Sequence, residues 1–481
     1  MVVVSLLVVT ARFLRRVVSG AREGRASPPH RHGPPGLEGA YSWGVPAVLY
    51  SADVLCSMTG PPLANGAVLV RDDRIVAVGP AQTLRDDADR RHHVDGVLLP
   101  GLVNAGTALE HADAAALAVA GPLDGWIRAL AATTGEWTEE QWGRSAHRGI
   151  LQALRAGTTA VFDTVCRGPA VPAACRAGLA GDSWVEVFMA DHEHRDAVLS
   201  AVERALALSA DGRRVGIAPH SPWALGTGVL QALAALAARG DAALHVRAAQ
   251  TPAEAAALAT GSGPLADLAR ERHMEFEWLG GGAHQDVVRY LDACSVLRAG
   301  TSLAGGVGID EAGVRLLADR GVTVVCRPRA DALRGAGELA LERYAGSGPA
   351  LALGTGSPAE VGDVDVLAEA SAWARLAASR GLRGWPSAAG PVPLDEQAVR
   401  LATVDGARAM GWGDRAGVLE PGRRADLAGV AVASTPRSVY RDLLSRGPGR
   451  QVLTVVGGVR KARRDDADRP WPLLDDDAWR P

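Results

Sequence analysis

Short apolar runs and alanine-rich amphipathic segments alternate through the middle of this 481-residue chain. Runs of this length are typical of strands buried on both faces, and apolar residues spaced three and four apart predict helices between them. The predicted helices include residues 140–155, 195–210, 226–239, 308–320 and 362–380. The predicted strands are residues 97–105, 157–165, 183–190, 215–220, 242–249, 295–300, 322–328 and 350–355.

Eight repeats of strand and helix predict an α/β fold, a TIM (β/α)8 barrel over residues 99–400. A doubly wound open sheet is the structural alternative. That fold carries a Gly-x-Gly-x-x-Gly turn after its first strand, and no such turn follows the first strand here. We therefore expect the barrel.

β-branched residues also cluster near both ends of the chain. Residues 47–54 and 67–78 lie around the turn signals Asn65-Gly66 and Asp72-Asp73, and residues 425–430 and 452–458 form a second β-rich group. We expect one small β-sandwich composed from both ends, with residues 46–98 as its first part. Residues 401–460, with a helix at their start, would be the second part, and residues 461–481 would be a charged C-terminal tail.

The first 45 residues have a different character. Residues 1–10 are almost wholly apolar, and the arginines follow them, which reverses the order found in a secretory signal. The run is also far shorter than the ~20 residues that span a bilayer. Residues 20–45 are rich in Gly, Pro, Arg and His. We expect residues 1–45 to be a disordered extension and not a membrane anchor.

Net charge and cysteine usage exclude some partners. A formal charge of -3 gives no bulk attraction to nucleic acid or to an anionic membrane, so we expect neither. The cysteines show no CxxC or CxH spacing, which favours a reduced, cytoplasmic protein. They are Cys56, Cys166, Cys175, Cys294 and Cys326.

Two motifs resemble those of the amidohydrolase superfamily. Pro100-Gly101-Leu102-Val103-Asn104-Ala105 is similar to the segment that leads into the family's His-x-His at the end of the first barrel strand. Residues 417–427, with Ala407-Arg408-Ala409 before them, resemble the family's C-terminal signature Gly-Ser-Leu-Glu-Pro-Gly-Lys-Arg-Ala-Asp-Leu. The resemblance covers residues 47–460 and lies in the cyclic-deaminase and chlorohydrolase branch, which includes imidazolonepropionase and aminofutalosine deaminase.

The resemblance implies a divalent metal at the carboxyl end of the barrel, and the chain departs from the family at every implied ligand. The positions of the four histidines and the aspartate hold Gly106, Ala108, Arg247, Ala299 and Gly356. Gln250 stands where the family has a proton-shuttling glutamate. A zinc site needs at least three protein ligands. We therefore expect no metal, no other cofactor and no catalytic residue at this site.

Other residues of the implied pocket are kept. His220 lies in Pro219-His220-Ser221-Pro222, which resembles the family's Pro-His-Ser-Pro, and His245 shares a strand face with Arg247. Our hypothesis for a ligand pocket comprises His220, Arg247, Gln250, Glu110, His111 and His245. A replacement metal site made of His111, His220 and His245 is the alternative to ordinary hydrogen-bonded histidines.

Arg247 needs a partner if it is buried, because an unpaired charge inside a protein is strongly destabilising. We expect either Glu110 or Asp163 to neutralise it, or a bound anion. In the second case Arg247, Gln250 and His220 would seat a carboxylate or a phosphate. The small residues around it are expected to leave the barrel mouth unfilled.

These observations predict an amidohydrolase-like pseudoenzyme that has lost its metal centre and binds a partner or a small ligand, an anion being one candidate. Two alternatives stay open. One is a hydrolase that acts on carbon–nitrogen bonds other than peptide bonds with an atypical site. The other is a structural subunit of an active paralogue, and a homodimer or a heteromer with that paralogue is the assembly to expect.

Overall fold

The structure is a computed structural model, and it describes residues 46–167, 170–209, 213–346, 348–469 and 471. The extension expected over residues 1–45 and the end of the tail lie outside the described residues. The domain boundaries given above stay predictions.

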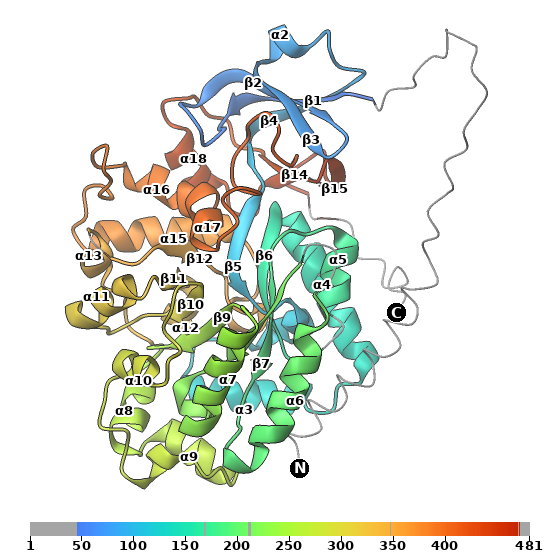
Figure 1. Ribbon diagram of the computed structural model, residues 1–481. Coiled ribbons are helices and arrows are strands. Elements are labelled where there is room, and N and C mark those ends of the chain that lie inside the picture. The colour runs from blue at the N-terminus through green and yellow to red at the C-terminus, as the bar shows by residue number, and fades with distance from the viewer. Residues whose placement is uncertain (1–45, 168–169, 210–212, 347, 470, 472–481) are drawn as a thin grey trace.

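Eight parallel strands form the barrel in the centre of the molecule (Figure 1). Neighbouring strands pair in chain order from first to last, and the Gly356 amide donates to the Gly106 carbonyl at 2.9 Å, which joins the last strand to the first. The predicted barrel is confirmed. Its strands are β5 (Leu102–Thr107), β6 (Thr158–Val165), β7 (Ser183–Val187), β8 (Val215–Pro219), β9 (Leu244–Ala248), β10 (Thr301–Gly305), β11 (Thr323–Cys326) and β12 (Leu351–Leu353).

The sixth barrel strand is not where the apolar pattern placed it. Residues 295–300 were expected as a strand, but β10 begins at Thr301. The buried Val296 and Leu297 follow the helix that ends at Ala293 and pack in the hydrophobic core. The chain then turns at Gly300, whose φ is +85°. An apolar run can be a buried turn as well as a strand, and periodicity does not separate the two.

Helices surround the barrel and bury the outer face of its strands (Figure 1). They are α3 (Leu123–Thr134), α4 (Glu139–Arg155), α5 (Ala170–Ala177), α6 (Arg195–Leu206), α7 (Thr227–Arg239), α8 (Pro252–Thr260), α9 (Pro264–Glu271), α10 (Val287–Ala293), α11 (Glu311–Asp319), α12 (Pro328–Leu333), α13 (Leu341–Tyr344), α14 (Pro358–Val361), α15 (Val366–Ser379), α16 (Leu394–Leu401) and α17 (Val404–Ala409).

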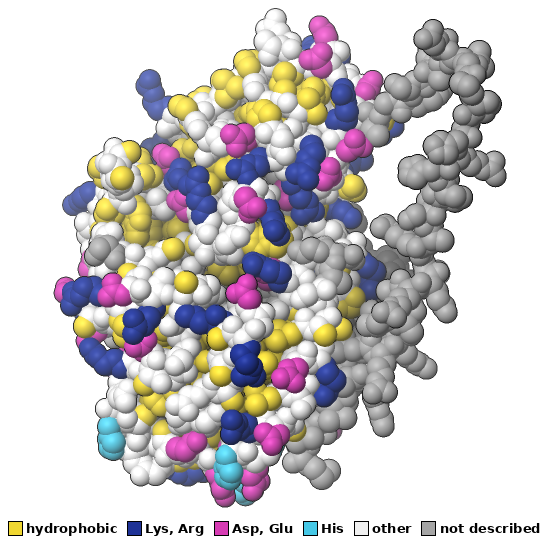
Figure 2. All heavy atoms as spheres, viewed as in Figure 1, with side chains coloured by type: hydrophobic (Ala, Val, Ile, Leu, Met, Phe, Trp, Pro, Cys, Tyr) yellow, Lys and Arg dark blue, Asp and Glu magenta, His cyan; other side chains and the backbone are white. Residues whose placement is uncertain are grey.

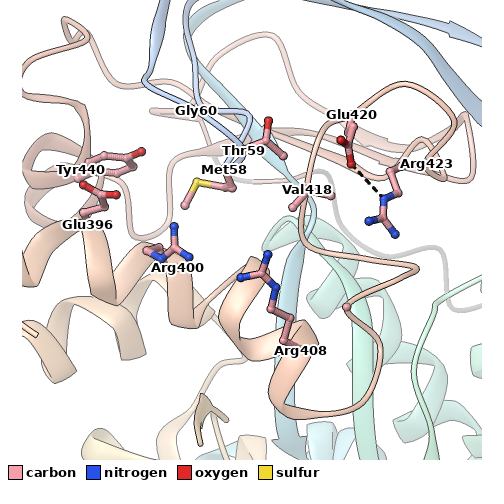
Figure 3. A pocket seen from close by; sticks show the side chains of 11 residues that line it. Met58, Thr59, Gly60, Glu396, Arg400, Arg408, Val418, Glu420, Arg423 and Tyr440 are labelled. Carbon is pink, nitrogen blue, oxygen red and sulfur yellow. Dashed lines mark hydrogen bonds and ion pairs between the residues drawn. The ribbon is translucent and has the colours of Figure 1, made fainter. Parts of the chain in front are cut away.

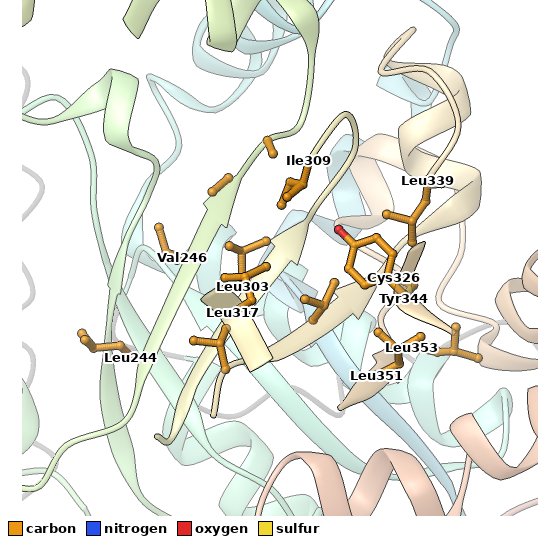
Figure 4. Close-up of a cluster of buried hydrophobic side chains, with 14 of the residues drawn as sticks. Leu244, Val246, Leu303, Ile309, Leu317, Cys326, Leu339, Tyr344, Leu351 and Leu353 are labelled. Atoms are coloured by element: carbon orange, nitrogen blue, oxygen red, sulfur yellow. The ribbon is translucent and has the colours of Figure 1, made fainter. Parts of the chain in front are cut away.

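Alternate residues of each barrel strand face opposite sides, and this fixes which side chains reach the mouth. Leu244 and Val246 of β9 belong to the hydrophobic cluster that also holds Leu303 of β10 (Figure 4). His245 and Arg247, the residues between and after them, therefore face the interior of the barrel.

The two ends of the chain meet in one seven-stranded sheet beside the barrel, which confirms that both ends build the smaller unit (Figure 1). β1 and β4 pair in parallel and the other pairs are antiparallel. The strands of this sheet are β1 (Val48–Leu55), β2 (Leu63–Arg71), β3 (Arg74–Pro80), β4 (Arg90–Pro100), β13 (Leu427–Val430), β14 (Gln451–Val456) and β15 (Val459–Arg463). Two helices lie between them in the chain, α2 (Ala81–Leu84) and α18 (Val439–Arg446).

Gly101 connects this sheet to the barrel, because β4 ends at Pro100 and β5 starts at Leu102. A Cβ at Gly101 would lie 2.2 Å from Cγ2 of Thr159 on the next strand, so only glycine fits this joint.

Basic and acidic side chains are interspersed over the face seen in Figure 2. Among the described residues, no helix has both the length and the apolar character that crossing a bilayer requires.

Candidate functional site

The carboxyl ends of the parallel strands meet at one mouth of the barrel, as in other barrels of this type. Gly106 lies near the end of β5, Ala108 follows it, Arg247 lies in β9 and Gly356 follows β12. Ala299 does not belong to this set, because it precedes β10 and so lies at the opposite end of that strand. The residue at the carboxyl end of β10 is Gly305, which also lacks a donor side chain.

A larger side chain at the end of β5 would meet its neighbours closely. A Cβ placed on Gly106 would lie 3.1 Å from Cγ1 of Val325 on β11, and one on Gly354 would lie 2.7 Å from the Gly106 carbonyl oxygen. Strands β5 and β12 therefore pack at backbone distance, with the side chain of Val325 beside them. The expectation of an unfilled mouth stays a prediction, although the space beside Gly106 is narrow.

The other two glycines adopt conformations that side chains resist. Gly305 has φ +121° and Gly356 has φ +70°, both in the region that favours glycine. A Cβ on Gly356 would meet Oε2 of Glu360 at 2.7 Å, and one on Gly305 would meet the Ala248 carbonyl oxygen at 2.5 Å. A histidine or an aspartate would therefore be strained at either position.

Arg247 is paired within the protein, and its partner is neither Glu110 nor Asp163. Its Nη1 donates to Oε1 of Glu186, the glutamate on β7, and lies 2.9 Å from Nδ1 of His220. The same Glu186 oxygen lies 3.0 Å from Nδ1 of His220. The two expected carboxylates have other contacts, because Glu110 accepts from the Cys166 amide and Asp163 from the Leu109 amide.

Electrostatics keep this group ionised. Burial by itself raises the pKa of Glu186, but the charge of Arg247 and the contact with His220 outweigh burial and hold that pKa well below its usual range. Burial lowers the pKa of His220, although Glu186 opposes that shift. At neutral pH the barrel mouth therefore contains a fixed guanidinium and a fixed carboxylate.

Cys166, at the end of β6, connects this pair with Glu110. Its Sγ donates to Oε2 of Glu186 at 2.8 Å, and its amide donates to Oε1 of Glu110 at 2.5 Å. Burial raises the pKa of the Cys166 thiol well above its usual value, and the two glutamates add to the effect. Burial also raises the pKa of Glu110 to about 8. The thiol is therefore a hydrogen-bond donor and not a nucleophile at neutral pH.

The remaining expected pocket residues make separate contacts. His111 Nδ1 lies 3.1 Å from the Ser357 hydroxyl, and His245 Nδ1 lies 2.8 Å from the Ser302 hydroxyl. Burial lowers the pKa of His111 to about 4 and that of His245 to about 3, so both rings are neutral. Gln250 accepts from Arg327 Nη2 at 3.3 Å and makes no contact with Arg247.

Several residues of the mouth escaped the sequence analysis, namely Glu186, Cys166, Arg327 and Glu360. Arg327 follows β11 and contacts Glu360 at 3.5 Å and Asp331 at 3.3 Å, all three being buried. One signal could have identified Glu186: it is the only ionisable residue of β7, and a charge inside an apolar strand needs a partner.

The positions at which the family resemblance implies metal ligands do not fit a hydrolytic zinc ion. Zinc takes nitrogen, sulfur and carboxylate oxygen ligands, and Gly106, Ala108, Gly305 and Gly356 supply none. Arg247 brings a positive charge to the same place. The alternative His111, His220 and His245 site does not form either. Over the described part of the chain, the group whose ligand atoms all lie within 4.8 Å of one another is Glu110, His111 and Cys166.

Comparison with known proteins identifies the protein family. The model of the amidohydrolase family matches residues 97–459, and that of the bacterial imidazolonepropionase-like composite domain matches residues 66–88. A 5-methylthioadenosine/S-adenosylhomocysteine deaminase of Natronomonas pharaonis is 29% identical over 425 residues, which is 83% of this chain and 91% of that protein. An aminodeoxyfutalosine deaminase of Deinococcus radiodurans is 29% identical over 331 residues, 65% of this chain and 76% of that protein.

Solved structures share the fold. An adenosine deaminase from Xanthomonas campestris with bound zinc has a TM-score of 0.71 at 21% identity, covering 86% of this chain and 93% of that chain. A guanine deaminase from Bradyrhizobium japonicum has a TM-score of 0.72 at 16% identity, covering 87% of this chain and all of the other. Since the family model spans most of the chain and the barrel is present, the chain belongs to the amidohydrolase family.

Proposed function

We propose that this amidohydrolase-family protein binds a small ligand at the barrel mouth without a hydrolytic metal at the strand ends. The observation that carries the proposal is the Arg247–Glu186 ion pair, beside strand-end glycines that carry no ligand side chain. A guanidinium held by a carboxylate is a fixed cation near the place where relatives would hold a metal ion.

Partly exposed groups around this pair are available to a ligand. The side chains of Arg247, His220 and Glu186 are 15%, 11% and 10% exposed. Arg247 uses Nη1 for Glu186, and its Nε and Nη2 have no hydrogen bond within the described residues. These donors favour a ligand that offers oxygen acceptors, a carboxylate included. Gln250 lies behind them, bonded to Arg327, and is not part of this contact surface.

A second candidate is a hydrolase acting on carbon–nitrogen bonds other than peptide bonds. The relatives favour it, since the curated proteins named above are deaminases. The cluster of Glu110, His111 and Cys166 also favours it, because those side chains offer oxygen, nitrogen and sulfur donors of the kind zinc accepts. When bound, the ion would supply a water of lowered pKa.

One experiment separates the two candidates. The purified chain is supplied with Zn²⁺, and ammonia release is measured from 5-methylthioadenosine and from S-adenosylhomocysteine, the substrates that the relatives' names give. The first proposal predicts no release above the buffer control. Turnover that the Cys166→Ser variant loses would reject it in favour of the hydrolase. Turnover that survives in Cys166→Ser would reject both the first proposal and the displaced zinc cluster.

A further inference from the structure

A cavity lies between the small sheet and the barrel, at the end of the barrel where β5 begins (Figure 3). Its volume is about 470 Å³, within the range of small-molecule sites. It shares no residue with the barrel mouth. Its lining comes from the turn after β1, from α16 to α18 and from the loop before β13: Met58, Thr59, Gly60, Glu396, Arg400, Arg408, Gly413, Val418, Glu420, Arg423 and Tyr440.

Two arginines of this cavity share one carboxylate. Arg400 donates from Nε and Nη2 to the two Asp405 oxygens, each at 3.0 Å. Arg408 approaches the same Asp405 only to 3.6 Å and makes no hydrogen bond to the described residues. One positive charge is therefore left over. Figure 3 shows both guanidinium groups turned toward the space below Met58.

The opposite charge lies at one end of the same cavity. Glu396 has no ion pair and no hydrogen bond within the described part of the chain, and neither does the hydroxyl of Tyr440 beside it (Figure 3). The other glutamate of the lining is different, because Glu420 Oε2 lies 3.4 Å from Arg423 Nε. Among the described residues the cavity thus presents the guanidinium of Arg408, which has an ion pair but no hydrogen bond, and the carboxylate of Glu396, which has neither.

We infer that this cavity binds a zwitterionic amino acid. The ligand's carboxylate contacts Arg408 and the remaining Nη1 edge of Arg400, since guanidinium groups match carboxylates in shape and charge. Its ammonium group contacts Glu396 and the Tyr440 hydroxyl. Met58 and Val418 supply the apolar contact for the ligand's side chain. A simple anion would be repelled by the carboxylate of Glu396, and a simple amine would be repelled by the guanidinium of Arg408. A molecule that carries both charges therefore fits best.

Calorimetric titration of the full-length chain with the standard L-amino acids, one at a time, tests this inference. The best binder is then compared with its methyl ester, which lacks the carboxylate, and with its deaminated acid, which lacks the ammonium. We expect saturable binding of the amino acid and affinities at least about tenfold weaker for both analogues.

Variants locate the site. Arg408→Gln should lower the affinity for the amino acid by about tenfold or more. The side chain of Arg408 is 62% exposed, so the fold is expected to persist in this variant. Glu396→Gln should lower the affinity for the amino acid and leave the affinity for the deaminated acid unchanged or higher. Arg415→Gln is the matched control, because this exposed arginine lies in the loop that follows α17, outside the lining. Absence of saturable binding by every amino acid, or native affinity in both cavity variants, would overturn the inference.

Discussion

The guanidinium of Arg247 on β9 donates a hydrogen bond to the carboxylate of Glu186 on β7, inside the mouth of the barrel. The amidohydrolase resemblance implies a metal-ligating histidine at the position of Arg247. Here the position carries the cation itself, attached to the chain and neutralised by a carboxylate from within the fold. The charges of Arg247 and Glu186 therefore balance each other within the fold.

Removing the cation should destabilise the protein. Arg247→Ala leaves Glu186 buried and charged without its partner, and loss of one member of a buried pair costs about 3–5 kcal/mol. Urea unfolding of the purified variant measures the change. The double variant Arg247→Met with Glu186→Gln removes both charges and should recover most of the loss. If the free energy of unfolding of Arg247→Ala lies within about 1 kcal/mol of the native value, the pair contributes little to stability.

Restoring an aspartate at Gly356 should also destabilise the protein. The position has φ +70°, and a Cβ there would lie 2.7 Å from Oε2 of Glu360. Backbone strain and like-charge repulsion together predict a loss of about 1–3 kcal/mol for Gly356→Asp. Gly308→Asp is the matched control, since its φ is +75° and nothing lies within 4 Å of its Cβ position. Equal losses in the two variants would mean that Glu360 makes no difference.

Glu254 should make stability depend on pH. Burial raises its pKa to about 7 from an ordinary value of 4.5, although the Ser221 hydroxyl at 2.6 Å and the Gln250 amide at 2.7 Å favour the charged form. Between these two pKa values the folded state holds a proton that the unfolded state has released. Glu254 therefore contributes less stability as pH rises through this window, by up to about 3 kcal/mol in total.

The measurement compares urea unfolding of the native chain and of Glu254→Gln at about pH 5 and about pH 8. Other groups titrate equally in both proteins, so the difference between them isolates Glu254. The native chain should lose stability relative to the variant at the higher pH. Parallel pH profiles for the two proteins would contradict the raised pKa.

Periodicity of apolar residues predicted the barrel and the sheet built from both chain ends, because burial of strands and helices follows from local pattern. It failed at residues 295–300, where a buried apolar turn has the same composition as a strand. As a result Ala299 was aligned with a ligand position that Gly305 occupies. The position of a strand along the sequence cannot be read from its own residues when the helix end next to it is equally apolar.

The site itself was predictable in part. Loss of the metal-ligating side chains could be read from single positions, since Gly106, Ala108 and Gly356 have no donor atom whatever surrounds them. The partner of Arg247 could not, because Glu186 lies 61 residues earlier in the chain and two strands away across the barrel. The packing of Val325 against Gly106 likewise depends on the relative height of two strands, which is a property of the assembled barrel.

The metal content of the full-length chain tests the central claim most directly. Protein expressed in zinc-supplemented medium and dialysed against metal-free buffer is measured by plasma mass spectrometry. The account predicts well below one zinc, iron or manganese ion per chain, because Gly106, Ala108, Gly305 and Gly356 offer no ligand atom and Glu186 is paired with Arg247. One tightly bound ion per chain would contradict it, and loss of that ion in Cys166→Ser would place the ion at the cluster of Glu110, His111 and Cys166.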